Sequence, residues 1–440
     1  MRVERQRQPS TRRPAIQLQV KTILNAVQHF PGFVYQEVQL CRHRDGRPRA
    51  IKITVAAHGG MGAKCSRCLK PAPCYDCWAQ RAWRFIPLWG IVTWFLYATR
   101  RGECPEHGVV VEHLPWSEGK RPVTRAMRGF LAVWARRLSW RETARAFATS
   151  WEGVYRSVEW FVPWGLAHRK LEGGESLGVD EIHWGQSKGA KSFLTVIYQI
   201  DRHCRRLLWV GPKRTQATLR RGLAALGPQV VGGLRFVGTD MWRPYLNVIA
   251  AQAGQALHVL DRFHITAHLN QAVDRVRRAE SGRRRGRPLA ERLKKRRWKL
   301  LRRGSRVRGR AKDKLHGLLR AKLATGRAWM LKETFQDFWR YRSPIWASAF
   351  LEVWCTRARR SRLEPMQQVA RMLRAHEELI LNWFRAKGKI SAGAVEGLNN
   401  KIRVVTRRSY GFRTYDAMEI ALYPTLGKLP EPDEFAHRFC

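Results

Sequence analysis

Between residues 177 and 264 the chain alternates apolar runs with polar breaks, and several of the runs end in an acidic residue. Runs rich in β-branched and aromatic residues predict strands, whereas apolar residues at helical intervals without an internal proline predict the helix 215–226. The strand-like runs are 177–185, 191–201, 205–211, 234–240 and 256–264. The expected order of elements is strand, strand, strand, helix, strand, helix, strand.

Acidic residues stand at the ends of these runs: Asp180, Asp240 and Asp261. A carboxylate inside a buried strand is costly to desolvate, whereas one at a strand end reaches the sheet edge, where ligands usually bind. Neighbouring carboxylates repel unless a cation lies between them, and Mg²⁺ is the natural candidate because it binds carboxylates together with phosphate oxygens. A two-metal site needs another acid, and we choose Glu396 on the expected helix 391–403. Any one acid can end a strand by chance, so the ordered set carries the prediction.

The order of elements is that of an RNase H-like α/β core. The 156 residues from Asp240 to Glu396 are more than a connection needs, and residues 265–390 are almost wholly helical in pattern. We therefore expect an RNase H-like catalytic core interrupted by an all-α insertion. Aromatic residues at helical intervals in 329–354 predict the core of that insertion, and stacking on an unpaired base at a DNA end is the alternative.

Residues 124–169 are helical in pattern, with Ser139 and Ser150 as the expected N-caps of a helix pair. This is the outline of a helix-turn-helix domain whose second helix, 151–161, enters a DNA groove, and an ordinary helical linker domain is the alternative. The contacts expected for DNA reading are Arg141, Arg145, Tyr155 and Arg156.

Pairs of metal-binding residue types lie upstream of this region. They are Cys65-x-x-Cys68, Cys74-x-x-Cys77 and Cys104-x-x-His107. Ligands two residues apart suit one tetrahedral Zn²⁺, because a tight turn aims both side chains at one point. The residues alone leave the ligand set open: the four cysteines from 65 to 77 form a compact candidate, and no metal at all is a further alternative. The odd number and uneven placement of the nine cysteines argue for a reducing compartment rather than disulfides.

The composition of the chain indicates what kind of partner it binds. In 440 residues, 83 Lys and Arg face 34 acids, a formal net charge of +49, while hydrophobic residues make up 44%. The chain can therefore bury a core, and its charge predicts nucleic acid as the partner, with a ribosomal-type protein as the alternative. Seventeen basic residues against two acids lie between 283 and 314, which predicts phosphate contacts that do not read sequence. The candidate contacts there are Arg283, Arg284, Arg285, Lys294, Lys295, Arg296 and Arg297.

The closing segment carries further candidates close to Glu396. They are Asn399, Asn400, Lys401, Arg403, Arg407 and Arg408. The two asparagines bond DNA or merely cap local backbone. No apolar run is long enough to span a bilayer, and no secretory signal follows the basic residues at the start, so we expect a cytoplasmic, nucleoid-associated protein without membrane contact.

Several separated motifs resemble, in the right order, the DDE transposases of bacterial insertion sequences, and most closely the ISL-three family. They are GVDE (178–181), GTDMWRPY (238–245), LDRFH (260–264), VEGLNNKIR (395–403) and RRSYGFRTY (407–415). The resemblance implies that Asp180, Asp240 and Glu396 are the catalytic, metal-binding triad. It also implies an accessory role for Asp261 with His264, to which we add Glu181. For zinc, it favours Cys65, Cys68, Cys104 and His107, although the family usually has cysteine at the last position.

The residue patterns and the family resemblance together give the expected domain organisation. It is a basic arm and small β region (1–60), a zinc-binding module (61–117), a helix-turn-helix domain (122–170), the first part of the core (175–264), a helical basic insertion (265–390), the closing core helix with the catalytic Glu (391–425) and a tail (426–440). The resemblance implies cleavage at insertion-sequence ends and strand transfer into target DNA. Two Mg²⁺ or Mn²⁺ ions about 4 Å apart serve the chemistry, and one Zn²⁺ is structural.

The partners expected on this basis are double-stranded DNA, both the terminal inverted repeats and the target, and another copy of the chain. Joining two ends implies a homodimer or a larger synaptic assembly. Two alternatives stay open at this point. One is an RNase H-like metal-dependent nuclease or resolvase, and the other is a DNA-binding regulator derived from a transposase that has lost catalysis.

Overall fold

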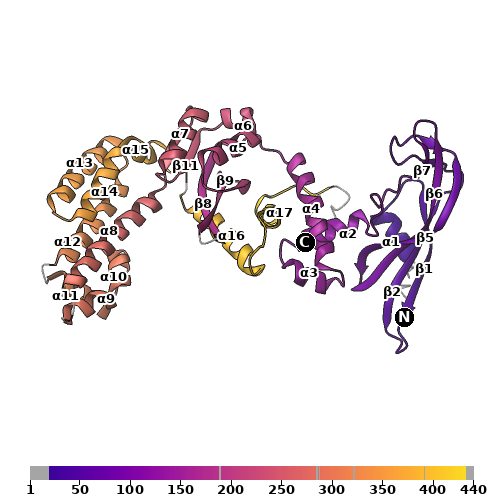
Figure 1. The fold of residues 1–440 in the computed structure, drawn as a ribbon, viewed down its shortest axis with the longest axis horizontal. Helices are drawn as coiled ribbons and strands as arrows, with labels where there is room; N and C mark the ends of the chain where they lie inside the picture. Colours follow the sequence, from indigo (N-terminus) through magenta and orange to yellow (C-terminus); the bar gives the residue numbers. More distant parts are fainter. Residues whose placement is uncertain are drawn as a thin grey trace, which may run out of the picture. The chain divides into compact units, whose positions relative to one another are not determined.

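The computed structural model describes residues 19–432 except 188–189, 284–285, 287, 321–322 and 391. The chain divides into two compact units (Figure 1). The first unit is Met1–Arg169 with Leu429–Cys440, and the second unit is Lys170–Lys428. Of the candidate DNA contacts, Arg284 and Arg285 lie outside the described residues.

The first unit contains a five-stranded sheet of order β1-β2-β6-β5, with β7 paired to β6. Its elements are α1 (Val20–Val27), β1 (Phe33–Arg42), β2 (Pro48–Ala57), β3 (Ala63–Lys64), β4 (Pro71–Ala72), β5 (Cys74–Leu88), β6 (Ile91–Cys104), β7 (Gly108–Val111), α2 (Arg125–Trp134), α3 (Trp140–Ala146) and α4 (Trp151–His168). Because β2 pairs in parallel with β6, one sheet joins strands from 1–60 and 61–117, the ranges expected to be separate regions.

An aromatic core and a tight turn hold this sheet. Trp89 and Gly90 join β5 to β6 with φ values of 52° and 77°, the positive values that a two-residue type I′ hairpin turn requires at both positions. The ring of Trp116 is fully buried. Four ring centroids lie 4.9–6.1 Å from that of Trp116, those of Phe30, Phe33, Trp83 and Tyr97. Such tilted and edge-on pairs are the favoured arrangements of aromatic rings.

Both expected N-caps of the helix pair are confirmed. Ser139 Oγ accepts a hydrogen bond from Glu142 N at 3.2 Å, and Ser139 N donates to Glu142 Oε2 at 2.9 Å, which completes a capping box at α3. Ser150 Oγ accepts from Gly153 N at 3.0 Å and caps α4. Helix α4 runs to His168, beyond the expected end at 161, because its buried face continues through Val162 and Gly165.

The second unit is built on another five-stranded sheet, of order β10-β9-β8-β11-β12. Strands β8, β9 and β10 are antiparallel neighbours, whereas β11 pairs in parallel with both β8 and β12. The elements of this part are β8 (Ser176–Ser187), β9 (Ala190–Ile200), β10 (Arg205–Pro212), α5 (Gln216–Leu226), α6 (Pro228–Gly232), β11 (Phe236–Thr239), α7 (Arg243–Gln252) and β12 (Leu257–Leu260). The predicted order of strands and helices is confirmed, with the short helix α6 added before β11.

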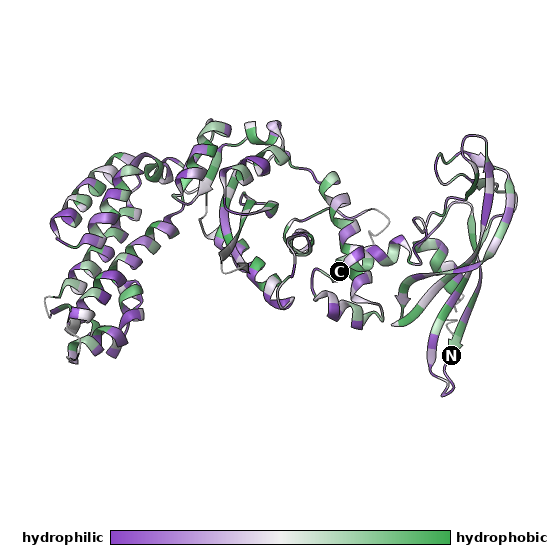
Figure 2. Ribbon diagram, in the orientation of Figure 1, coloured by the Kyte–Doolittle hydropathy of each residue, from purple (hydrophilic) through white to green (hydrophobic). Residues whose placement is uncertain are grey.

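Helices make up the rest of the second unit, as the sequence predicts. They are α8 (Arg262–Arg283), α9 (Pro288–Lys295), α10 (Arg297–Leu301), η1 (Gly304–Arg306), α11 (Arg310–Arg320), α12 (Ala324–Phe335), η2 (Gln336–Arg340), α13 (Pro344–Arg360), α14 (Glu364–Ala375), α15 (Glu377–Arg385), α16 (Ala392–Arg408) and α17 (Tyr415–Leu426). Hydrophobic and hydrophilic residues alternate in short blocks along them (Figure 2), as expected of helices that bury one face. No helix within the described ranges is both apolar and long enough for a membrane span.

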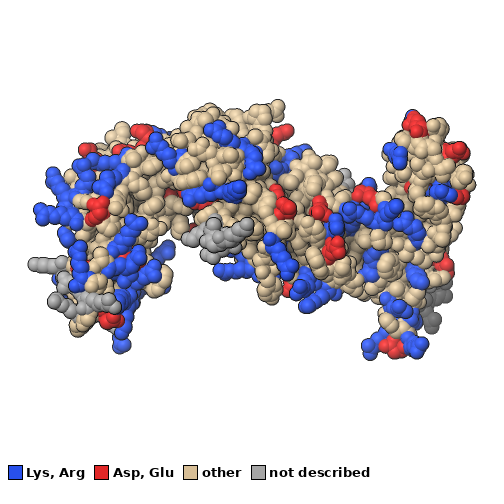
Figure 3. All heavy atoms as spheres, viewed as in Figure 1, with Lys and Arg blue, Asp and Glu red and all other residues tan. Residues whose placement is uncertain are grey.

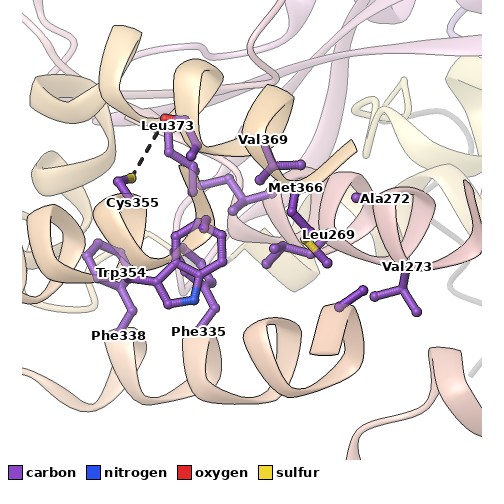
Figure 4. Close-up of a cluster of buried hydrophobic side chains, with 14 of the residues drawn as sticks. Leu269, Ala272, Val273, Phe335, Phe338, Trp354, Cys355, Met366, Val369 and Leu373 are labelled. Carbon is purple, nitrogen blue, oxygen red and sulfur yellow. Dashed lines mark hydrogen bonds between the residues drawn. The ribbon is translucent and has the colours of Figure 1, made fainter. Parts of the chain in front are cut away.

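The aromatic residues of 329–354 contribute to the core of this helical region, as predicted. Phe335, Phe338 and Trp354 are buried and pack with Leu269 and Met366 from α8 and α14 (Figure 4). The Phe335 ring lies 5.2 Å from that of Phe338 and 5.0 Å from that of Trp354, centroid to centroid. The helices around the sheet therefore have a well-packed core of their own.

A buried histidine lies where the sheet meets the helices. His258 Nε2 is 2.7 Å from Thr239 Oγ1, which donates its proton to the Asp240 carbonyl at 2.8 Å, so the imidazole donates to Thr239. The His258 carbonyl accepts from Asn382 Nδ2 of α15 at 2.7 Å. Burial lowers the pKa of His258 to about 4 from its ordinary 6.5, because the charged imidazolium has little access to water there.

Acid should therefore weaken the second unit through His258. The unfolded chain takes up a proton near pH 6.5 and the folded chain only near pH 4, so stability present above pH 6.5 is lost as the pH falls towards 4. Between pH 7.5 and pH 5 the free energy of unfolding should fall by about 2 kcal/mol more in the wild type than in His258→Gln. Hydrogen exchange of peptides covering β11 and β12 measures this difference. An equal fall in both proteins would contradict it.

Candidate active site

The register of parallel strands places three aspartates at the same level of the second sheet. Gly178 of β8 pairs with Gly238 of β11, so Asp180 and Asp240 each lie two residues beyond that pair. Thr239 of β11 pairs with Leu260 of β12, so Asp240 and Asp261 each lie one residue beyond theirs. Neighbouring strands are about 4.8 Å apart. Three carboxylates therefore lie level across neighbouring strands. Asp240 and Asp261 directly follow the ends of β11 and β12, as expected. For Asp180 the expected strand end is wrong, because β8 continues to Ser187 and Asp180 lies just beyond the point where its parallel pairing with β11 ends.

These acids line one small pocket of about 20 Å³ together with His264. Asp180 is 9% exposed, and its burial raises the pKa of its carboxyl. Burial likewise raises the pKa of Asp261 to about 6, and the charges of Asp180 and Glu396 add to the rise. Clustered carboxylates with little access to water repel one another, and a divalent cation bound between them relieves this repulsion.

Asp180 is held in position by α16. Its Oδ2 accepts a hydrogen bond from Asn399 Nδ2 at 2.6 Å, and its Oδ1 accepts from Glu181 N at 2.8 Å. The buried Tyr198 hydroxyl donates to Asn399 Oδ1 at 2.7 Å. Asn399, expected as a DNA contact or a backbone cap, is thus buried, and both ends of its amide are used to orient an acid of the pocket.

Glu396 lies in a different place from the pocket aspartates. It is exposed on α16, one helical turn before Asn399, and lines an adjoining groove, while its neighbour Val395 lines the acid pocket. In the described part of the chain, Asp180, Asp240 and Glu396 do not belong to a set of ligand atoms mutually within 4.8 Å. The structure brings the two aspartates together and places the glutamate at the border of their pocket.

An arginine that the sequence analysis missed lies against the acids. Arg214 Nη2 is 2.8 Å from Glu181 Oε1 and 3.1 Å from Asp240 Oδ2, and its guanidinium carbon lies 4.2 Å from the centre of the Trp242 ring. Burial and the Asp240 charge nevertheless raise the pKa of Glu181 to about 8. Glu181 Oε2 is buried, and no described residue bonds it. Arg214 occurs in a turn after β10, where nothing in its sequence context distinguishes it from the other arginines.

Asp261 also begins the helix that carries His264. Its Oδ1 accepts from Phe263 N at 2.8 Å at the start of α8, and its Oδ2 lies 3.9 Å from His264 Nε2. The accessory pair expected from the sequence is therefore adjacent in space, at the same pocket as Asp180 and Asp240.

A second set of metal-type side chains lies in the first unit. The ligand atoms of Cys65, Cys68, Cys104 and His107 all lie within 4.8 Å of one another. Cys68 Sγ is 3.6 Å from Cys104 Sγ, and His107 Nδ1 is 3.6 Å and 3.7 Å from the sulfurs of Cys104 and Cys65. A tetrahedral zinc site with Zn–S bonds of about 2.3 Å has edges of about 3.8 Å. These four side chains could therefore hold one Zn²⁺.

The local fold produces this set. Cys65 follows β3, while Cys104 ends β6 and His107 lies in the turn before β7. Backbone N–H groups of Cys68 and Arg67 lower the pKa of Cys65 to about 6, which favours the thiolate form that binds metals. The remaining pair of the compact alternative, Cys74 and Cys77, is exposed on β5 outside the set.

The candidate contacts on the helix pair are accessible in part. Arg141 and Arg145 are exposed on α3, whereas Tyr155 packs with its ring edge-on to Trp140, 5.2 Å between centroids. Arg156 is exposed but forms ion pairs with Glu152 at 3.4 Å and with Glu159 at 3.7 Å. The two arginines of α3 are the side chains that present their charge most freely.

Basic residues of the second unit are largely exposed, and Figure 3 shows Lys and Arg gathered over its helices with few acids among them. Arg283, Lys294, Lys295 and Arg297 are exposed and Arg296 is half-buried; Arg297 also pairs with Asp274 at 3.4 Å. On α16 the exposed candidates are Asn400, Lys401, Arg403 and Arg407, whereas Arg408 is half-buried. Most of the described basic residues between 283 and 310 thus face solvent, where a polyanion can reach them.

Comparisons with known proteins also indicate a transposase. The profile of a family described as "Transposase", the ISL3 (ISL-three) group of DDE transposases, matches residues 177–422. The transposase for insertion sequence element IS1557 of Mycobacterium tuberculosis is 27% identical over 433 residues, which cover 90% of this chain and 93% of that protein. The transposase for IS1001 of Bordetella parapertussis is 31% identical over 241 residues, which cover 54% of this chain and 58% of that protein.

Proposed function

Because this chain belongs to the ISL-three family of DDE transposases, we propose that it cuts DNA at the ends of an insertion sequence and joins the freed 3′ ends to target DNA. The observation that carries the proposal is the level row of acids on neighbouring strands of the second sheet, Asp180, Asp240 and Asp261, all of which line one pocket. Strand order β10-β9-β8-β11-β12, with the order of elements along the chain, supports an RNase H-like core.

The residues fit a divalent cation. Two aspartates share a pocket, burial raises the pKa of Asp180, and a buried Glu181 oxygen has no partner among the described residues. We assign Mg²⁺ or Mn²⁺ binding to Asp180, Asp240 and Glu396, with two ions per site. Bound there, the metal supplies activation of the attacking water or 3′-hydroxyl and neutralisation of charge on the leaving oxygen.

We include Glu396 with the aspartates because of its position on α16. Asn399, one turn further along, already contacts Asp180 at 2.6 Å, so the helix is anchored at the pocket. The charge of Glu396 contributes to the raised pKa of Asp261, which places the two carboxylates within electrostatic range. Because the Glu396 side chain is exposed, we propose that it turns towards the aspartates when metal binds.

The chain's own residues orient and balance this site. Asn399 fixes the rotamer of Asp180, and Tyr198 fixes Asn399. Arg214 offsets the repulsion between Glu181 and Asp240. Asp261 and His264 are accessory groups that bound the pocket on the side of α8. Phosphoryl transfer of this type depends on positioning and charge neutralisation, so no covalent enzyme intermediate is needed.

We assign DNA recognition to the rest of the chain. The α3–α4 pair serves as the helix-turn-helix, and Cys65, Cys68, Cys104 and His107 hold one structural Zn²⁺ in the neighbouring sheet. The exposed basic residues of α9, α10 and α16 bind phosphates of the terminal repeats and of the target. Joining two ends requires two copies of the site, so the active form is a homodimer or a larger assembly.

The test uses the full chain and a short double-stranded oligonucleotide that carries one end of its element. With Mg²⁺ or Mn²⁺ we expect cleavage at the end and a longer product in which that end is joined to a second DNA. Both products should disappear in EDTA. Cleavage without joining would favour a nuclease or resolvase, and binding without either product would favour a regulator that has lost catalysis.

A further inference from the structure

A wide groove adjoins the acid pocket in the second unit. It has a volume of about 620 Å³ and is lined by Phe263 at the start of α8, by Glu396 of α16 and by residues 302, 303 and 306. The first turns of α8 and α16 also line the acid pocket, through His264 and Val395. The two hollows are therefore neighbours, and Glu396 lies in the groove beside a residue, Val395, that lines the acid pocket.

The groove is strongly basic on one side. Arg302, Arg303 and Arg306 are exposed, and no described carboxylate forms an ion pair with any of them. Glu396 is the sole acid among the described residues that line it. Unpaired guanidinium groups facing a hollow offer a binding site for several successive phosphates.

The turn that carries these arginines, residues 302–306, is fixed from behind by a buried lysine. Lys332 is 2% exposed, and its Nζ donates to the carbonyls of Leu300 at 2.8 Å and Arg302 at 2.9 Å. Its ion-pair partner Glu333 also accepts from Gly304 N at 2.8 Å. Burying an ammonium group is unfavourable unless its bonds are satisfied, and here they hold the backbone of the turn. The arginines are therefore presented from a rigid support.

An exposed aromatic ring lines the same groove as this turn. Phe263 is 52% exposed, although its backbone is fixed because its N–H donates to Asp261 Oδ1 at 2.8 Å. Half of a phenyl ring therefore faces the groove side of α8 instead of the core. An aromatic face beside a row of cations is the combination that binds single-stranded nucleic acid, because bases stack on the ring while phosphates contact the cations.

We propose that this groove binds an unpaired stretch of the DNA strand next to the cut site, an inference that rests on the proposed function. Phe263 stacks on an unpaired base, and Arg302, Arg303 and Arg306 contact the phosphates that follow it. Pockets that enclose a small ligand have volumes of roughly 300–1,000 Å³, so the groove has room for a base as well as a phosphate. A paired base offers no free face, which predicts a preference for single strands.

The experiment measures binding of the full chain to a labelled 12-nucleotide oligo-dT and to a 12-base-pair duplex by fluorescence anisotropy in EDTA, where no cleavage occurs. Phe263→Ala should weaken binding of the single strand about tenfold and that of the duplex less than about twofold. Phe263→Trp, which keeps a stacking face, should restore it. Trp346→Ala removes another exposed ring, 67% exposed on α13, and should change neither.

The arginines are tested through salt dependence. Replacing Arg302, Arg303 and Arg306 together by Gln should lower the slope of log Kd against log salt for the single strand by about 2, because each phosphate contact contributes about 0.7. The matched control replaces the exposed Arg357, Arg359 and Arg360 of α13 by Gln, an equal loss of charge away from the groove, and should lower it less.

Unchanged single-strand binding in both groove variants, or an equal loss for duplex and single strand in Phe263→Ala, would overturn the inference. The proposed function fails separately. If the wild type shows no metal-dependent cleavage yet Phe263→Ala weakens single-strand binding, the groove stands and the transposase chemistry does not. If the wild type cleaves and the groove variants bind and cleave normally, only the groove assignment is wrong.

Discussion

Asp180→Asn should slow metal-dependent cleavage of end DNA on the order of a thousandfold while leaving the protein folded. The change removes a charge that the proposed metal ions need, and several kcal/mol of transition-state stabilisation correspond to that factor. The fold should survive because asparagine has the same shape and its single carbonyl oxygen can still accept from Glu181 N, so that the variant loses one of the two hydrogen bonds. Burial raises the pKa of Asp180, so a neutral side chain there also removes a desolvation penalty. Gel assays of cleavage and thermal unfolding measure the two effects.

The same outcome is expected for Asp240→Asn and for Glu396→Gln. A matched control is Asp201→Asn, because Asp201 is also buried just beyond a strand of the same sheet but bonds Gln199 Nε2 at 2.8 Å, outside the acid pocket. That variant should cleave normally. Near-normal cleavage by any of the three acid variants would remove that residue from the proposed metal site, and Asp261, level with Asp240 on β12, would take its place as the next acid to test.

Removing the metal from the cysteine–histidine set should unfold this end of the first unit, which contains the two-stranded sheet β3–β4 and the strand β7. The buried cluster there consists of Cys65, Ala72 and Cys104, with only Cys68 and Val110 packed against it, so it has little apolar area to hold it without the metal. Structural zinc binds with a free energy of roughly 10–16 kcal/mol. Losing the metal therefore costs more stability than the burial of this small apolar cluster provides. We expect Cys104→Ser to lose zinc and to expose this end to proteolysis.

The control for that experiment is Cys74→Ser. Cys74 is exposed on β5 and lies outside the four-residue set, so zinc content and proteolysis should stay at the wild-type level. Metal content per chain, measured by atomic emission, reads out both variants. Normal zinc content in Cys104→Ser, or loss of zinc in Cys74→Ser, would move the proposed ligands towards the compact arrangement of four cysteines.

Local patterns predicted much of the second unit and the caps of the helix pair in the first unit. Alternating and β-branched runs placed β8 to β12 in the right order, and the N-caps Ser139 and Ser150 were identified from the residue types that suit that position. The meeting of Asp180 and Asp240 at one pocket was also expected, although the stated reason holds only for Asp240, because Asp180 lies inside β8 and not at its end. These features depend on residues close in sequence or on strand geometry alone.

Other parts of the site depend on contacts that no local pattern encodes. Asn399 and Asp180 are 219 residues apart, and either asparagine of the pair at 399–400 could have faced inward until the packing of α16 on the sheet decided it. Arg214 pairs with acids on β8 and after β11, and it is one of many arginines in a chain with 83 basic residues. Its position against these acids is known only from the distances in the structure. In a chain with so many arginines, the sequence does not single this one out.

The parallel pairing of β2 with β6 was not predicted either, because it also depends on contacts between distant parts of the chain. A small β region was expected within 1–60, but the partner strand β6 belongs to the range expected to be a separate module, and the register of Ala50 with Val92 comes from the tertiary fold. Likewise, Lys332 looked like one more cation in a basic helix. Its burial beneath residues 300–302 depends on the packing of α10 against α12.

The anchoring of Asp180 by α16 has a consequence for how the protein is made. Ribosomes synthesise the aspartate-bearing strands and the basic helices well before the helix that carries Glu396 and Asn399. A nascent or prematurely terminated polypeptide that stops before α16 lacks both Glu396 and the amide that orients Asp180, so on the proposed mechanism it would be unable to cut DNA.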